Sequence, residues 1–226
     1  ASYRWLGHLR GGLAMATVAA CAGFAAVSGS SLATVATMAK VSIPAMRKFN
    51  YADSLAAGTV AAGGTLGMLI PPSAAMIVYG ILTETDIAKL FVGGIAPGIL
   101  TVFVYIIVIA VVTRIFKDSG PAGLRSSWSE RLISLYKVWG VVVLFLVIMG
   151  GIFFGVFTPG EAGSIGAVGA LAFAVGRRKM TWRLFFESLV EAGRITALIF
   201  AVAFGALILN QFVNIARMPE AIAAFI

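Results

Sequence analysis

Long apolar blocks divide this sequence, and charged residues collect between them. The blocks cover residues 12–27, 32–46, 55–82, 90–116, 138–157 and 195–213, with a shorter seventh block at 162–176. A helix that crosses about 30 Å of hydrocarbon needs about 20 apolar residues. The last three of the six long blocks meet this length, whereas the first two and the seventh are too short. The pattern predicts an all-α polytopic membrane protein.

Composition and charge exclude several other classes of protein. Hydrophobic residues make up 60% of the 226 residues and charged residues 12%, against about 45–50% and 25% in soluble domains. The net charge of +8 lies in the loops, as the positive-inside bias of membrane proteins requires, so we expect a lipid bilayer and no nucleic acid as partner. One cysteine, one histidine and no phosphate-binding loop GxxxxGK[ST] argue against a disulfide, a metal cluster, ATP hydrolysis, a bound cofactor and an enzyme.

The loop charges give an orientation. If basic loops are cytoplasmic, block 55–82 runs outward and block 90–116 returns. Both outer ends of the first two blocks are basic, with Arg4, Arg10, Lys40, Arg47 and Lys48. Both ends therefore belong on the same side, which predicts a re-entrant hairpin over 12–46 with its tip at Ser28–Ser31. A pair of short tilted spans is the alternative.

Block 55–82 carries two adjacent prolines in its middle. Pro71 has no N–H, and Pro72 forces Pro71 out of the α region. Gly63, Gly64 and Gly67 weaken the preceding turns. We therefore predict a helix over 54–82 that is broken near residues 68–73. An ordinary proline kink in a packed helix is the alternative.

Two irregular points thus lie at membrane depth, and their meeting would create a binding site. Free carbonyls coordinate small cations, and the N-termini of half-helices attract anions. Such a site suits an anionic substrate and a coupling cation such as sodium. The predicted substrate-binding residues are Ser30, Ser31, Pro71, Pro72 and Ser73. The predicted cation-binding residues are Ser28, Gly29, Gly64, Thr65, Gly67 and Met68.

The second half of the chain offers weaker signals. Thr158-Pro159 reads as the start of a helix over 162–176, with Glu161 as a capping carboxylate or, less simply, a functional acid. Gly163, Gly166 and Gly169 give that helix a smooth face for packing. Residues 181–194 predict an amphipathic helix along the cytoplasmic interface, ahead of a span over 195–213. Residues 130–137 predict a short helix.

Three long segments resemble a known family. GGLAMATVAACAGFAAVSGSSLATVATMAKVSIPAM, AAGTVAAGGTLGMLIPPSAAMIVYGILTETDIAKLFVGGIAPGIL and GIFFGVFTPGEAGSIGAVGAL are similar to the large membrane subunit of tripartite ATP-independent periplasmic (TRAP) transporters. The resemblance implies an elevator-type transporter with inverted repeats in the bacterial inner membrane. It implies a sodium-coupled secondary importer of small organic acids such as dicarboxylates. It also implies two partners, a small membrane subunit and a periplasmic substrate-binding protein.

On this reading, residues 1–89 form the transport-domain part of repeat 1. Residues 90–137 form a connecting transmembrane helix and a cytoplasmic loop, and residues 138–226 begin repeat 2. Members of the family also carry a second hairpin and a second proline-broken helix, which do not occur here. The chain would then hold about half of a substrate site and be part of a longer protein. The alternative is a truncated homologue that serves as a structural or assembly subunit of another membrane complex.

Overall fold

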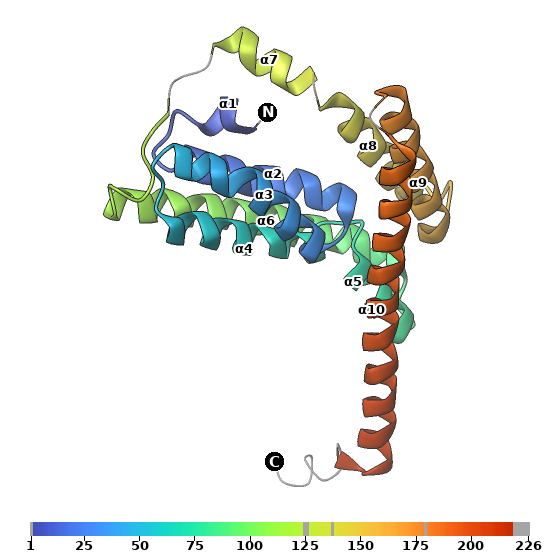
Figure 1. Ribbon diagram of the computed structural model, residues 1–226. Helices are drawn as coiled ribbons and strands as arrows, with labels where there is room; N and C mark the ends of the chain where they lie inside the picture. Colours follow the sequence, from blue (N-terminus) through green and yellow to red (C-terminus); the bar gives the residue numbers. More distant parts are fainter. Residues whose placement is uncertain (1, 124–126, 137, 179, 219–226) are drawn as a thin grey trace. The chain divides into compact units, whose positions relative to one another are not determined.

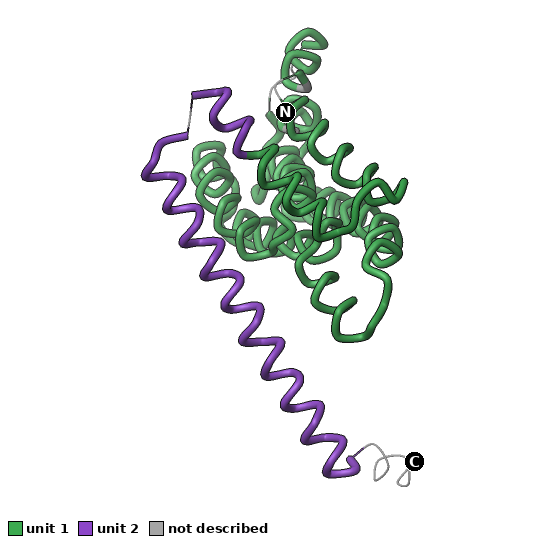
Figure 2. Tube along the Cα trace, turned by 90° about the vertical axis from the view of Figure 1, so that its right-hand side faces the viewer, with its two compact units in different colours: residues 1–170 green, residues 171–226 purple. Residues whose placement is uncertain are grey.

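The computed structural model describes residues 2–123, 127–136, 138–178 and 180–218. Over these ranges the regular structure is α-helix throughout. The helices are α1 Ser2–Leu6, α2 Gly12–Ser28, α3 Ser31–Lys48, α4 Asp53–Leu69, α5 Ala74–Leu82, α6 Ile87–Ile115, α7 Trp128–Tyr136, α8 Trp139–Phe153, α9 Pro159–Gly176 and α10 Trp182–Ile215. The chain forms two compact units, residues 1–170 and 171–226 (Figure 2).

In the first unit, helices α2, α3, α4 and α6 pack side by side (Figure 1). Their shared core mixes small side chains, mostly alanine, with a few larger ones. Its buried members are Ala14, Met15, Val18, Cys21, Ala25, Met46, Tyr51, Ala56, Leu66 and Ile109. Between helices in lipid there is little hydrophobic driving force, so close packing of small residues supplies much of the attraction. The composition of this core fits that requirement.

One face of α4 is built for close approach to the α2–α3 hairpin. A methyl group on Gly63 would lie 2.6 Å from the sulfur of Cys21 on α2. A methyl group on Gly64 would collide with Val35 on α3, and one on Gly67 would collide with the start of α3. Gly67 lies four residues after Gly63 and three after Gly64, so all three contribute to one face of α4. Side chains at these positions would separate α4 from the hairpin.

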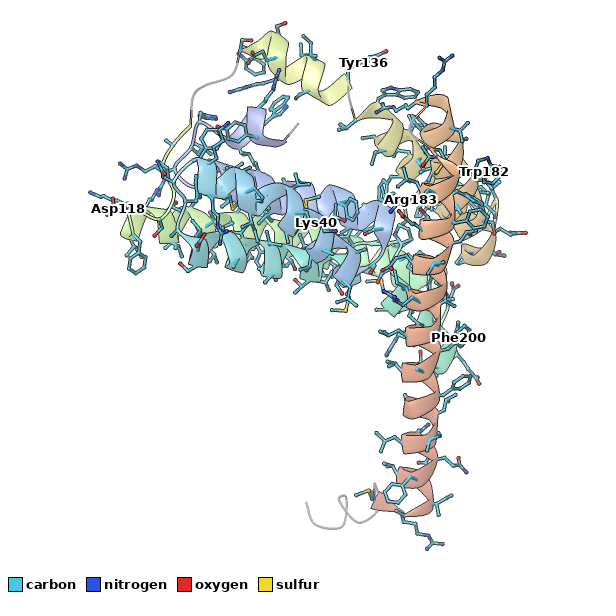
Figure 3. All side chains as sticks on the ribbon, viewed as in Figure 1. Lys40, Asp118, Tyr136, Trp182, Arg183 and Phe200 are labelled. Atoms are coloured by element: carbon cyan, nitrogen blue, oxygen red, sulfur yellow. The ribbon has the colours of Figure 1, made fainter. Side chains whose placement is uncertain are left out.

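Polar contacts hold the base of the hairpin together. The Tyr51 hydroxyl accepts a hydrogen bond from the Leu13 N–H, 3.1 Å, and donates to the Pro121 carbonyl, 3.0 Å. Backbone bonds join Gly11 to Gly120, Ala52 to Ser119 and Gly123 to Gly7. The loop after α6, which holds Asp118 (Figure 3), is thereby fixed to both ends of the hairpin. We call this set of contacts the base latch.

A second apolar cluster joins α6 to α8 and α9. Its buried members are Phe91, Ile148, Met149, Ile152 and Ala162. The turn before α9 confirms the predicted helix start. The Glu161 N–H donates to the Thr158 hydroxyl, 3.3 Å, and the Glu161 carboxylate accepts from the Thr158 N–H, 2.7 Å, and hydroxyl, 2.9 Å. These bonds hold the pKa of the Glu161 carboxyl below its usual value.

The predicted glycine face of α9 is only partly used in packing. Methyl groups on Gly166 and Gly169 would lie 3.0 Å from Ile148 and 2.6 Å from Leu144 on α8. A methyl group on Gly163 would meet no atom within 4 Å. Two of the three glycines thus allow close approach between α8 and α9.

The second unit differs from the sequence prediction. In place of an interfacial helix over 181–194 and a separate span over 195–213, it contains the single helix α10, which begins at Trp182 after the N-cap Thr181. The segment contains no proline, and one glycine at 193 costs only about 1 kcal/mol in a helix. Nothing local therefore ends the helix between the two predicted elements. Its side chains, Phe200 among them, project along its whole length (Figure 3).

By length and composition, α6 and α10 are long and apolar enough to cross a membrane. Two bent pairs, α4 with α5 and most of α7 with α8, also meet the test as pairs. The prediction of a single span over 138–157 was too long, because α8 ends at Phe153 and Gly155 turns with a positive φ of 67°. Lys40 lies within α3 (Figure 3) and not in the loop after it. The short predicted helix at 130–137 is α7, and Lys137 lies outside the described residues.

Candidate functional site

The hairpin tip is a two-residue break between α2 and α3. Gly29 takes the left-handed conformation, φ 59°, and its N–H donates to the Ala25 carbonyl, 2.8 Å. Ser30 is the N-cap of α3, and its hydroxyl accepts from the Ala33 N–H, 3.3 Å. Glycine adopts this conformation without strain, and serine is a preferred N-cap. The tip sequence therefore ends one helix and starts the next within two residues.

The broken helix separates α4 from α5 by residues 70–73, with a bend of 43°. Pro71 and Pro72 have no N–H, so the carbonyls of Gly67 and Met68 lose their normal helical donors. The hydroxyl of Ser73, a fully buried residue, donates to the Met68 carbonyl, 3.0 Å. The Ser73 hydroxyl thus replaces the lost donor of the Met68 carbonyl and not that of the Gly67 carbonyl. The helix break expected near residues 68–73 is present.

The tip and the break contact each other directly. The Ala74 N–H, at the start of α5, donates to the Gly29 carbonyl, 3.2 Å. A methyl group on Gly29 would lie 2.5 Å from the Pro72 carbonyl oxygen, and one on Gly67 would lie 2.7 Å from the Ser31 nitrogen. Both α3 and α5 begin at this contact, so two helix N-termini with partial positive charge lie together. We call this contact the tip–break junction.

The predicted substrate-binding residues all belong to the tip–break junction. Ser30 and Ser31 line its tip side, and Pro72 its break side. Pro71 and Ser73 are buried. The hydroxyls of Ser30 and Ser73 already bond the backbone, which shows that they shape the two turns. Their contact with a substrate stays a prediction.

The predicted cation-binding residues divide between two faces of α4. On the hairpin side, the Ser28 hydroxyl lies 3.2 Å from that of Thr34, and Gly29, Gly64 and Gly67 form the junction. On the other side, the Thr65 hydroxyl donates to the Ala62 carbonyl, 2.7 Å, and lies 3.0 Å from the Tyr105 hydroxyl of α6. The Met68 side chain is 47% exposed. The side chain of Thr65 is therefore turned toward α6. Met68 offers only its backbone carbonyl oxygen to a cation at the break.

The sequence analysis missed Thr34, Gly94 and Gly98. Thr34 is fully buried, and its hydroxyl donates to the Ser30 carbonyl, 2.7 Å, while lying beside Ser28. Its signal was a hydroxyl four residues after Ser30. Gly94 and Gly98 on α6 lie against Leu69 and Ile70 at the break. Their signal was a pair of glycines four residues apart around Pro97.

The junction is electrically neutral and next to apolar surface. Residues 28–34 and 67–74 contain no ionisable side chain. Among the described residues, no three His, Cys, Asp or Glu side chains come together as a metal site would require. A cavity of about 320 Å³ touches Val27 and Pro72 and extends to Phe91 and to helices α8 and α9. Main-chain dipoles and hydroxyls are thus the groups that this site offers to ions.

Comparison with known proteins places these features in a family. The family model described as "Tripartite ATP-independent periplasmic transporter, DctM component" matches residues 1–226. The chain is 40% identical over 223 residues to the C4-dicarboxylate TRAP transporter large permease protein DctM of Pseudomonas aeruginosa, covering 98% of this chain and 52% of that protein. It is 35% identical to the ectoine/5-hydroxyectoine TRAP transporter large permease protein UehC of Ruegeria pomeroyi, covering 96% and 51%.

A third relative, the sialic acid TRAP transporter permease protein SiaT of Haemophilus influenzae, is 35% identical over 86% of this chain and 31% of its own length. The chain thus spans about half the length, or less, of these relatives. All three are transporter permeases and not enzymes. The match of the family model over the whole chain shows that the protein belongs to the DctM component family of tripartite ATP-independent periplasmic transporters.

Proposed function

We propose that this chain supplies half of the binding site of a sodium-coupled secondary importer of small organic acids. The tip–break junction carries the proposal, because the Ala74 N–H to Gly29 carbonyl bond joins two interruptions that lie 45 residues apart in the sequence. A membrane protein tolerates irregular backbone at depth only where protein or a water-filled cavity satisfies its polar groups. Discontinuous helices of this kind form substrate and ion sites in secondary transporters.

In this proposal the two ligands use different groups of the junction. The N-termini of α3 and α5 favour a carboxylate, since helix N-termini attract anions. The carbonyl oxygens of residues 29, 67 and 68 favour a hard cation such as sodium. A neutral junction binds the two charges most readily together, because each offsets the other in a low dielectric. Joint binding of this kind would couple uptake to a sodium gradient.

The wider mechanism is also proposed from the family. We propose two inverted repeats that move as an elevator in a bacterial inner membrane, with several membrane crossings. The partners would be a small membrane subunit and a periplasmic binding protein that delivers the substrate. Relatives named for C4-dicarboxylates, sialic acid and isethionate support an organic acid as the substrate class.

Uptake by the full-length protein with both partners, reconstituted in vesicles under a sodium gradient, tests the proposal. Gly67→Ala places a methyl group 2.7 Å from the backbone of Ser30 and Ser31, so the junction must open. Gly58→Ala on the same helix meets no atom within 4 Å and is the matched control. We expect Gly67→Ala to lower sodium-driven uptake at least about tenfold and Gly58→Ala to leave it unchanged. Sodium-independent uptake, or equal rates in the two variants, would contradict the proposal.

A further inference from the structure

Helix α6 contacts the break through two of its glycines. Gly94 and Gly98 are buried and lie one turn apart on α6. A methyl group on Gly94 would lie 3.1 Å from the Leu69 carbonyl oxygen and 2.5 Å from the end of Met76. A methyl group on Gly98 would lie 3.0 Å from the Ile70 side chain and 3.6 Å from the Leu69 oxygen. The last residue of α4 and the first residue of the break therefore rest on α6.

The Leu69 carbonyl lies at the end of α4, next to the junction. It belongs to the last turn of α4, where carbonyls lack the normal succession of helical donors. Its neighbours have specific partners, since the Leu66 carbonyl accepts from the Ile70 N–H, 2.8 Å, and the Met68 carbonyl from the Ser73 hydroxyl. Leu69 lies two positions after Gly67, which is in contact with Ser30 and Ser31. A shift of Leu69 would therefore also move Gly67 and its contact with the hairpin tip.

The break is thus held between two glycine faces that leave little room. Gly64 and Gly67 allow the hairpin to approach α4. Gly94 and Gly98 allow α6 to approach Leu69 and Ile70. Contacts of 3.0–3.4 Å require the neighbouring atom to move by a few tenths of an ångström. At Gly94 the nearest atom is the flexible end of Met76, and the next is the Leu69 backbone oxygen at 3.1 Å, which cannot change rotamer. At Gly98 the atom that must move belongs to the Ile70 side chain, 3.0 Å away. A methyl group at Gly94 would consequently displace the Leu69 backbone, and one at Gly98 would press on the Ile70 side chain.

We propose that Gly94 and Gly98 are positioning residues that set the place of the Leu69–Ile70 backbone, and through it the geometry of the tip–break junction. This inference rests on the proposed function, since it assigns the two glycines a part in forming the same site. They bind no ligand themselves. Their effect reaches the ligands through the carbonyls at the end of α4.

Substitution of adjacent glycines tests the inference in the full-length protein with its partners. Gly94→Ala is compared with Gly93→Ala, because a methyl group on Gly93 meets no atom within 4 Å while both replacements raise helix propensity equally. The measurements are the sodium and substrate concentrations that give half-maximal uptake, and the thermal stability without either ligand. We expect Gly94→Ala to raise at least one of the two concentrations roughly fivefold to tenfold, as displacements well below 1 Å can do. We expect Gly93→Ala to match the wild type.

Two further variants separate displacement of the backbone from simple repacking. In Met76→Ala/Gly94→Ala the flexible end of Met76 is gone, but the Leu69 oxygen still meets the new methyl group. We expect this double variant to keep the shift relative to Met76→Ala alone. Gly98→Ala, with the longer 3.6 Å approach to the Leu69 oxygen, should give a smaller shift and carries the test if Gly94→Ala does not fold.

The outcomes distinguish this inference from the proposed function. Wild-type uptake without sodium dependence would refute the coupled-import proposal. The half-maximal substrate concentrations of Gly94→Ala and Gly93→Ala could still be compared, so the role of Gly94 would still be tested. Half-maximal concentrations that are the same in Gly94→Ala and Gly93→Ala would overturn the inference. The inference would also be overturned if the half-maximal concentrations of Met76→Ala/Gly94→Ala equalled those of Met76→Ala alone. A loss of thermal stability with unchanged half-maximal concentrations would assign Gly94 a structural role only.

Discussion

The base latch makes a prediction that can be worked through in numbers. Tyr51→Phe keeps the aromatic ring, which is 6% exposed, and removes the hydroxyl that bridges the Leu13 N–H and the Pro121 carbonyl. Each partly buried group left without a partner costs about 1–3 kcal/mol. A cavity of about 20 Å³ touches Leu13, Tyr51 and Pro121, which is enough for one water. That water can restore part of the loss, so we expect a destabilisation of about 1–2 kcal/mol.

Thermal unfolding of the purified full-length protein in detergent measures this loss. The relatives are about twice as long as this chain. For a protein of that length each kcal/mol lowers the midpoint by about 1 °C, so the expected decrease is about 1–2 °C. Tyr79→Phe is the control, because that side chain is 57% exposed. Hydrogen exchange should accelerate at the start of α2 in Tyr51→Phe only. Equal midpoints for the two variants, with unchanged exchange at Leu13, would refute the role given to the latch.

Two more predictions concern helix ends. The Asp86 carboxylate accepts hydrogen bonds from the N–H groups of Ala88, 2.8 Å, and Lys89, 3.3 Å. Asp86→Ala should therefore lower the free energy of unfolding by about 1 kcal/mol, whereas Asp86→Asn should keep most of the capping stabilisation. Thermal unfolding of the two variants measures the difference. The lowered pKa of Glu161 means that its bonds to Thr158 stabilise the folded state above the ordinary glutamate pKa and are lost as the pH falls through the lowered value. Unfolding midpoints of wild type and Glu161→Gln should therefore differ at neutral pH and converge in acid; a constant difference would contradict this account.

Local chemistry made both interruptions predictable from the sequence. Pro71 and Pro72 cannot donate hydrogen bonds whatever surrounds them, and Gly29 and Ser30 have strong preferences for a helix end and a helix start. The Thr158–Glu161 capping box was predictable for the same reason, since its partners lie three residues apart. Each of these features depends on only a few neighbouring residues.

Other features depend on which face of a helix meets which neighbour. Thr65 and Gly67 were assigned together, but they lie two residues apart and so occupy different faces of α4. Tyr51 and Pro121 are 70 residues apart, and no local pattern pairs them. The extension of α10 through residues 194 and 195 was missed because a change from charged to apolar composition does not by itself end a helix.

The hydrogen bond between the Ala74 N–H and the Gly29 carbonyl has a consequence for any movement of the hairpin. When the tip withdraws from the break, one donor and one acceptor lose their partners in the same step. If the junction lies at membrane depth, as proposed above, water is scarce there, and the exposed pair is costly until something replaces both halves of the bond. An incoming carboxylate can take the N–H and an incoming cation can take the oxygen. Either ligand alone would leave half of the broken bond unsatisfied.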